Sequence, residues 1–134
     1  MLSTLNNTLR LWDYVSNTCA RAYTGHSSQK FCCFAAFGAH DSTVLAGGED
    51  TCLHVWDLQS GAEVQTLDGC EPPSTGAADA PAAAAPPPRG DGHCDVVCAV
   101  DVHPLRRMVA TGALDKDRTV KLWWTAAEAA ATGA

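Results

Sequence analysis

Four residues in the last third of the chain have the types that bind transition metals: His93, Cys94, Cys98 and His103. Structural zinc sites favour cysteine pairs two to four residues apart together with a second pair of ligands. Cys98 and His103 are five positions apart in one predicted strand, and side chains alternate along a strand, so they face opposite sides. Cys94 belongs to the start of a loop. The spacing therefore predicts no metal site, and we expect no cofactor.

No group of residues has the arrangement of a catalytic centre. The sequence shows no glycine-rich phosphate loop, no nucleophile with a partner base and no carboxylate pair. Asp13, Asp50, Asp57 and Asp117 fall at predicted turns or strand ends. We therefore expect a protein without catalytic activity. An enzyme is the competing class, and it would need a pocket that contains a titratable group with a perturbed pKa.

Three stretches with the same pattern organise the chain. They are Thr8 to Asp13 (TLRLWD), Leu53 to Asp57 (LHVWD) and Thr119 to Trp124 (TVKLWW). In each, apolar and polar residues alternate before a tryptophan, which is typical of a half-buried strand. Gly25-His26 precedes Trp56, and Gly92-His93 precedes Trp123. This combination is similar to the repeat signature of a WD-repeat β-propeller blade, so we predict an all-β fold.

Blades of about 40 to 45 residues come 4 to 8 to a ring, so 134 residues hold about two and a half four-stranded antiparallel blades. The fold prediction is thus a partial WD-repeat propeller whose ring is not closed within this chain. The predicted units are 1–24, the outer half of a blade with two strands; 25–69, a complete blade; 70–91, a disordered Pro/Ala-rich insertion; 92–125, an incomplete terminal blade; and 126–134, a flexible tail. The insertion explains why Trp56 and Trp123 are 67 residues apart, whereas Trp12 and Trp56 are 44 apart.

The charge and cysteine content exclude several classes of function. A net charge of -6 argues against direct binding to nucleic acid, which needs a basic face. No segment approaches the ~20 apolar residues of a membrane helix, and the amino end does not resemble a signal peptide. Seven cysteines fit no disulfide framework and suggest a reducing compartment. Because no secretion signal is recognised, Arg89-Gly90-Asp91 is not expected to bind an integrin.

Several runs resemble one family in particular. They are NNTLRLWDY (6–14), YTGH (23–26), KFCCFAAF (30–37), DVV (95–97), HP (103–104) and KDRTVKLW (116–123). Together they are similar to the carboxy-terminal blades of the WD-repeat scaffold subunit of COMPASS and MLL-type histone lysine methyltransferase complexes. The resemblance implies a scaffold that binds methyltransferase-complex subunits and histone tails, in the nucleus or also in the cytoplasm.

In that family the mouth of the central channel holds an arginine of a peptide between two phenylalanines. The resemblance places Phe34 as one of them, Cys32 beside the guanidinium and Phe31 against the peptide. A flat cation gains from an aromatic face on each side. The second phenylalanine belongs to a blade outside this chain, so arginine binding by this chain alone is expected to be weak or absent. From alternation alone, Phe34 would instead lie in the core of a strand predicted from Phe31 to Phe37.

A second surface in that family is a groove that takes an acidic, apolar segment of a partner subunit. The resemblance places Leu11, Arg21, Phe37 and Gln59 in this groove, at the junction of the partial and the complete blade. Arg21 replaces the usual lysine and keeps the charge.

The resemblance also implies a structural hydrogen-bond relay in each blade. The first relay is His26, Asp50 and Trp56, and the second is His93, Thr111, Asp117 and Trp123. The serine that is usual in the relay is replaced near Ala46 in the first set, which weakens it.

Other functions remain compatible with the sequence. One is a WD-repeat adaptor of a different complex, such as a ubiquitin ligase. Another is a truncated product without independent function. Open strand edges can pair with other chains, so self-association and marginal stability are also expected.

Overall fold

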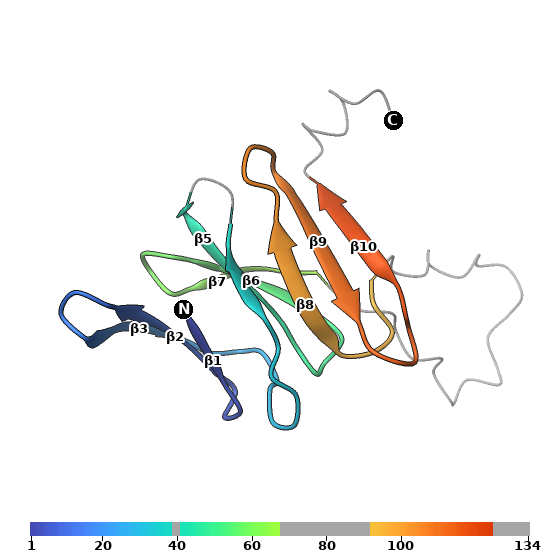
Figure 1. The fold of residues 1–134 in the computed structure, drawn as a ribbon, viewed down its shortest axis with the longest axis horizontal. Coiled ribbons are helices and arrows are strands. Elements are labelled where there is room, and N and C mark those ends of the chain that lie inside the picture. The colour runs from blue at the N-terminus through green and yellow to red at the C-terminus, as the bar shows by residue number, and fades with distance from the viewer. Residues whose placement is uncertain (39–40, 68–91, 125–134) are drawn as a thin grey trace, which may run out of the picture.

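The computed structural model describes residues 1–38, 41–67 and 92–124, which form ten strands in three antiparallel sheets (Figure 1). The first sheet contains β1 (Leu2–Thr4), β2 (Thr8–Asp13) and β3 (Thr18–Tyr23). The second contains β4 (Ala35–Phe37), β5 (Thr43–Gly47), β6 (Leu53–Asp57) and β7 (Glu63–Leu67). The third contains β8 (Val97–Val102), β9 (Met108–Ala113) and β10 (Val120–Trp124).

The prediction of an all-β fold is confirmed, and the described residues close no ring. In Figure 1 the second sheet lies between the other two. The predicted insertion at 70–91, with the Arg89-Gly90-Asp91 triplet, and the predicted tail at 126–134 lie outside the described residues. No helix among the described residues is long and apolar enough to cross a membrane.

Two strands differ from the prediction. The first sheet has a third strand, β1, which pairs with β2 from Leu2 opposite Arg10 to Thr4 opposite Thr8. The strand predicted from Phe31 to Phe37 begins only at Ala35. The amides that precede β4 bind elsewhere, because those of residues 29 to 31 donate to the Glu49 carboxylate and that of residue 34 donates to the Cys98 carbonyl.

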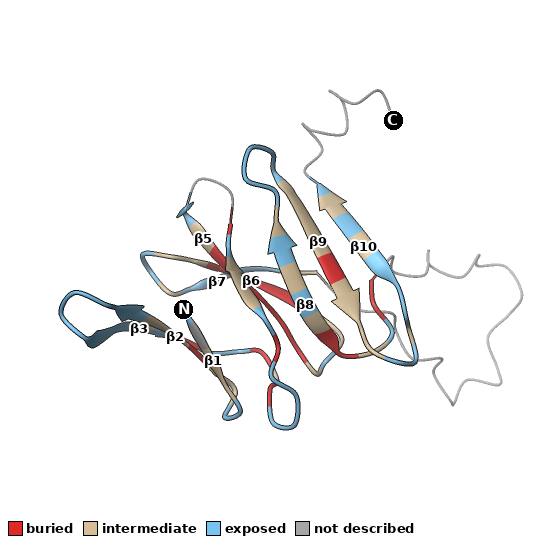
Figure 2. Ribbon diagram, in the orientation of Figure 1, coloured by how far each residue is buried: buried red, intermediate tan, exposed pale blue. Residues whose placement is uncertain are grey.

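The main core lies between the first and second sheets. It consists of Leu9, Tyr23, Val44, Ala46 and Trp56, each fully buried (Figure 2). Leu9 and Tyr23 face each other across β2 and β3, and Val44 and Trp56 do so across β5 and β6. Because every second residue of a strand points to the same side, this register gives one apolar face to each sheet. The same face of the second sheet carries Phe37, which pairs with Val44.

The second and third sheets meet through their inner strands, because β4 and β5 contact β8. The backbones come very close there. A Cβ atom on Gly47 would lie 2.0 Å from the Val97 carbonyl oxygen, so only glycine fits at this position. The Val97 amide also donates to the Gly48 carbonyl at 3.0 Å. Backbone hydrogen bonds therefore join the second and third sheets directly, where β8 meets the segments next to β4 and β5.

Candidate functional site

The third sheet contains a continuous relay of buried hydrogen bonds. His93 is 1% exposed, with Nδ1 2.7 Å from Asp117 Oδ2 and Nε2 2.7 Å from Thr111 Oγ1. Trp123 Nε1 donates to the same Thr111 oxygen at 2.7 Å. A single proton arrangement satisfies every group: indole to threonine, threonine hydroxyl to Nε2, and Nδ1–H to the carboxylate. The structure thus brings together all four residues of the second predicted relay.

Asp117 is the charged end of this relay. Burial raises the pKa of its carboxyl group, but hydrogen bonds from Thr119, the Cys94 amide and His93 outweigh burial and lower the pKa to about 2. The carboxylate therefore stays ionised and fixes the loop before β10 against the segment before β8. Its role is structural, because its oxygen atoms are occupied by groups of the chain itself.

The second sheet does not build the same relay. His26 is 2% exposed, yet neither of its ring nitrogens has a hydrogen-bond partner among the described residues. Asp50 instead contacts His54 Nε2 at 3.0 Å, and Glu63 contacts His54 Nδ1 at 2.6 Å. The Trp56 indole donates to the Thr24 carbonyl at 2.9 Å. The structure therefore does not join His26 to Asp50 as the sequence suggested.

One missing hydroxyl accounts for the difference. Val44 pairs with Trp56 and Val109 pairs with Trp123, so Ala46 holds the place in the second sheet that Thr111 holds in the third. Ala46 cannot accept from the indole or donate to a histidine. His54, which pairs with Ala46 across β5 and β6, binds the carboxylates of Asp50 and Glu63. Asp50 is therefore bound to His54 and not to His26. Sequence reasoning missed His54, although its position two residues before Trp56 is the available signal.

Restoring the hydroxyl should restore the relay. We expect Ala46→Ser to raise the free energy of unfolding by about 1 kcal/mol, because the new side chain gives His26 a buried hydrogen-bond partner. Urea unfolding of the variant and the wild type measures this difference. The gain should vanish in a His26→Phe background, and an equal gain in that background would show that the serine acts without His26.

The two neighbouring histidines should titrate on opposite sides of the ordinary histidine pKa. Burial and the nearby charge of His54 lower the pKa of His26. Burial also acts to lower the pKa of His54, but its hydrogen bonds to Asp50 and Glu63, with their charges, raise it overall. The rings are 6.3 Å apart.

A raised pKa in the folded state means that protonated His54 stabilises the fold below about pH 6.5, and that this stability is lost as the pH rises through the folded pKa. In the His26→Phe variant the opposing titration of His26 is removed. The free energy of unfolding of this variant should therefore fall as the pH increases from about 6 to 8. NMR titration of the imidazole C–H signals assigns both pKa values in the wild type. A His54 midpoint below that of His26 would contradict the assignment.

The residues assigned to the arginine-peptide channel lie on the surface just before β4. Phe34 is 67% exposed, Phe31 is 43% exposed and Cys32 is exposed. Phe34 therefore lies outside the core, contrary to the expectation from alternation alone. Three consecutive amides, ending with that of Phe31, bind the Glu49 carboxylate at 2.5 to 2.9 Å and hold this segment in place. An arginine side chain could approach the open ring of Phe34.

The residues assigned to the partner groove come from the first two sheets. Leu11 and Arg21 pair across β2 and β3. Arg21 extends over the turn between β6 and β7, because a Cβ atom on Gly61 would lie 3.3 Å from Arg21 Cδ. Gln59 is exposed in this same turn. Phe37, 40% exposed, ends β4 at the same end of the second sheet, since β5 begins and β6 ends there.

The junction that carries these four residues is fixed by contacts between the first two sheets. The Tyr23 hydroxyl donates to the Leu58 carbonyl at 3.1 Å and ties the first sheet to the turn that carries Gln59. Leu11 and Leu58 are partly buried against the main core. Arg21 lies near Asp57, whose pKa is lowered chiefly by hydrogen bonds from Ser60 and to a smaller extent by Arg21. The residues assigned to the partner groove therefore combine apolar side chains with one cation.

No group of three or more histidine, cysteine or acidic side chains within residues 1–38, 41–67 and 92–124 is arranged to hold a metal ion. His93 is engaged in its relay, and His103 Nδ1 accepts the amides of Leu105 and Arg106 at 3.1 Å. The two histidines considered first in the sequence thus take part in hydrogen bonds within the chain.

Comparison with known proteins places these features in a family. The family model of the WD domain, G-beta repeat, matches residues 17–57 and 88–123, more than half of the chain. GID complex subunit 7 of Schizosaccharomyces pombe is 39% identical over 64 residues, which are 47% of this chain and 13% of that protein. A WD repeat-containing protein of Dictyostelium discoideum is 32% identical over 68 residues, 50% of this chain and 12% of the relative.

A longer match covers most of the chain. The WD repeat domain-containing protein 83 homolog of Dictyostelium discoideum is 22% identical over 121 residues, 90% of this chain and 30% of that protein. The chain thus spans less than a third of the length of each of these relatives. With the repeat matched in two places and three blade-like antiparallel sheets, the chain belongs to the WD40 repeat family.

Proposed function

We propose that the chain is a non-catalytic protein-interaction scaffold whose principal docking surface is the groove formed by Leu11, Arg21, Phe37 and Gln59. The observation that supports this most is the combination at one sheet junction of exposed apolar surface with a cation. An acidic, apolar segment of a partner protein is complementary to both features. The four residues come from two sheets that the Tyr23 hydroxyl ties together, so binding there would need little rearrangement.

The proposed partners are subunits of a histone lysine methyltransferase complex in the nucleus. This part of the proposal rests on the resemblance of the runs at residues 6–14, 30–37 and 116–123. The exposed Phe31, Cys32 and Phe34 form the proposed secondary site for an arginine-containing peptide such as a histone tail. The open edge strands of the sheets offer a further route to self-association.

A second candidate is an adaptor of a different multi-subunit complex. One relative, 39% identical over 64 residues, is named as a subunit of the GID complex. The same groove would then receive a segment of another partner, for example within a ubiquitin ligase. The two candidate functions predict different co-purifying proteins, but both use the groove residues as the docking surface.

Replacing one phenylalanine on each surface with alanine tests which site binds which ligand. We expect Phe37→Ala to weaken binding of the acidic, apolar partner segment by about 30-fold, because it removes the one aromatic side chain among the four groove residues. Phe34→Ala is the matched control, because it removes the same side chain from a more exposed place. Fluorescence polarisation with the labelled segment measures both.

The control should leave affinity for the segment within about twofold of the wild type. It should instead reduce whatever affinity an arginine-containing peptide has. Equal loss of segment binding in both variants would remove the groove from the proposal.

A further inference from the structure

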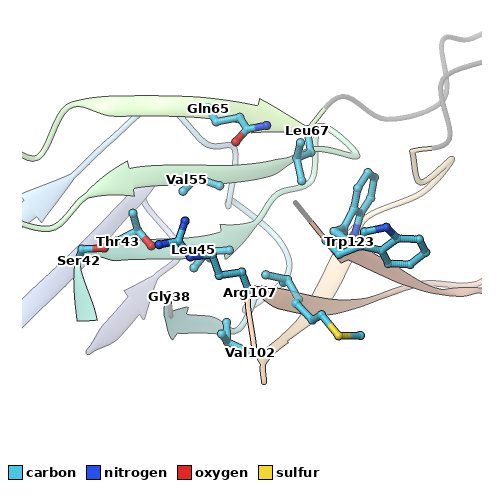
Figure 3. A pocket seen from close by; sticks show the side chains of 13 residues that line it. Gly38, Ser42, Thr43, Leu45, Val55, Gln65, Leu67, Val102, Arg107 and Trp123 are labelled. Atoms are coloured by element: carbon cyan, nitrogen blue, oxygen red, sulfur yellow. The ribbon is translucent and has the colours of Figure 1, made fainter. Parts of the chain in front are cut away.

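A cavity lies on the face of the second sheet opposite to the face that carries Phe37. It has a volume of about 400 Å³ and is bounded by the second and third sheets (Figure 3). Its lining residues are mostly apolar, and most come from β5, β6 and β7 on one side and from β8, β9 and β10 on the other. Gly38, Ser42 and Arg107 lie in the segments between strands. Of the lining residues only Trp123 belongs to a relay, and none belongs to the surfaces described above.

The walls are two rows of side chains in register. Leu45 pairs with Val55, which pairs with Gln65, so these three side chains lie side by side across the second sheet. Val102 pairs with Val109, which pairs with Trp123, and this row crosses the third sheet. The sheets touch at β4, β5 and β8 and separate toward β7 and β10, which leaves the space between the rows open.

The lining of the cavity carries positive charge and no negative charge. Arg107 is the only charged residue among those that line it. Its guanidinium has no carboxylate within ion-pair distance in the part of the chain that the structure describes. In Figure 3 its side chain extends from the third sheet toward the strand that carries Thr43 and Leu45. A ligand of this cavity should therefore carry an anionic group beside an apolar body.

The strands at the outer side favour an extended peptide over a compact molecule. β7 pairs only with β6, and β10 pairs only with β9, among the described strands. Both outer strands contribute to the lining, through Gln65 and Leu67 on β7 and through Trp123 and Trp124 on β10. An open edge can pair with the backbone of an added strand, while the cavity receives its side chains.

We propose that this cavity is a docking site for an extended segment of a partner protein, in which an acidic side chain that pairs with Arg107 is flanked by large apolar side chains. A volume of about 400 Å³ is in the range of ligand pockets in proteins, which suits two or three apolar side chains. The site is independent of the groove around Phe37, which lies on the other face of the same sheet.

A peptide array tests the proposal with the full chain as the probe. The array carries nine-residue peptides in which the central position is varied over all residue types between leucine, isoleucine, valine or phenylalanine neighbours. We expect the wild type to prefer aspartate or glutamate at the centre by about tenfold over glutamine or lysine. Equal binding of acidic, neutral and basic centres would overturn the proposal.

Two charge-reversal variants test whether Arg107 causes the preference for an acidic central residue. Both are made in an Arg21→Glu background, which removes the cation of the groove around Phe37. In that background Arg107→Glu should abolish or invert the acidic preference that remains, because it replaces attraction by repulsion. Arg106→Glu is the matched control: this neighbour is also exposed but does not line the cavity. Both substitutions are on the surface, and unchanged urea unfolding verifies the fold. An acidic preference that survives in Arg107→Glu, or that disappears equally in Arg106→Glu, would contradict the assignment.

Discussion

Replacing Trp56 with alanine is expected to lower the free energy of unfolding by about 3 to 5 kcal/mol, the largest effect of any single substitution considered. Trp56 is fully buried at the centre of the core between the first and second sheets. Its ring lies 6.1 Å from that of Tyr23 and 5.5 Å from that of His26, and its indole donates to the Thr24 carbonyl. The substitution removes these contacts and leaves a cavity that β-strands cannot readily close.

Trp12 provides the control, because it follows the same alternating pattern in β2 but is 41% exposed. Trp12→Ala should cost less than about 1.5 kcal/mol. Urea unfolding followed by circular dichroism measures both variants. If Trp56→Ala and Trp12→Ala were equally destabilising, the core would not be where the structure places it.

Replacing Asp117 with alanine is expected to lower the free energy of unfolding by about 3 kcal/mol. The substitution leaves His93, 1% exposed, without its charged partner, and it removes the acceptor of the Cys94 amide. Asp115→Ala is the control, since the Asp115 side chain is 97% exposed and its contact to Arg118 is 4.0 Å long. Such an exposed pair contributes at most about 1 kcal/mol.

The pH dependence provides a second signature of Asp117. Its pKa is about 2 in the folded protein against 3.8 ordinarily, so its contribution is present above about pH 4 and is lost as the pH falls toward 2. The wild type should lose stability over this range more steeply than Asp117→Ala. Parallel pH profiles for the two proteins would mean that the carboxylate is not held in the relay.

The sequence predicts most strands well, because alternation before each tryptophan reflects burial of one sheet face. The strand prediction fails where a strand is very short or where a distant side chain binds the backbone amides. β1 is only three residues long, too short for a period to be recognised. The strand before Ala35 is shortened because Glu49, far away in the sequence, binds the amides that a strand would use.

Some candidate sites can also be predicted from the sequence, whereas others depend on contacts between distant segments. The relay of the third sheet follows from residue types at fixed spacing, since His93, Asp117 and Trp123 have one geometry that satisfies them all. The second sheet departs from the pattern because one hydroxyl is missing at Ala46 and His54 competes for Asp50. The cavity beside Arg107 depends on how two sheets diverge, which no local pattern encodes.

Affinity purification of the tagged protein from nuclei, in the wild-type form and as Arg21→Glu, tests the central claim most directly. The charge reversal is at a half-exposed position, so the fold should persist. The proposal predicts that quantitative mass spectrometry recovers histone methyltransferase subunits with the wild type and loses them with the variant. Recovery of the same proteins at the same level with both forms would contradict the claim that this groove is the docking surface.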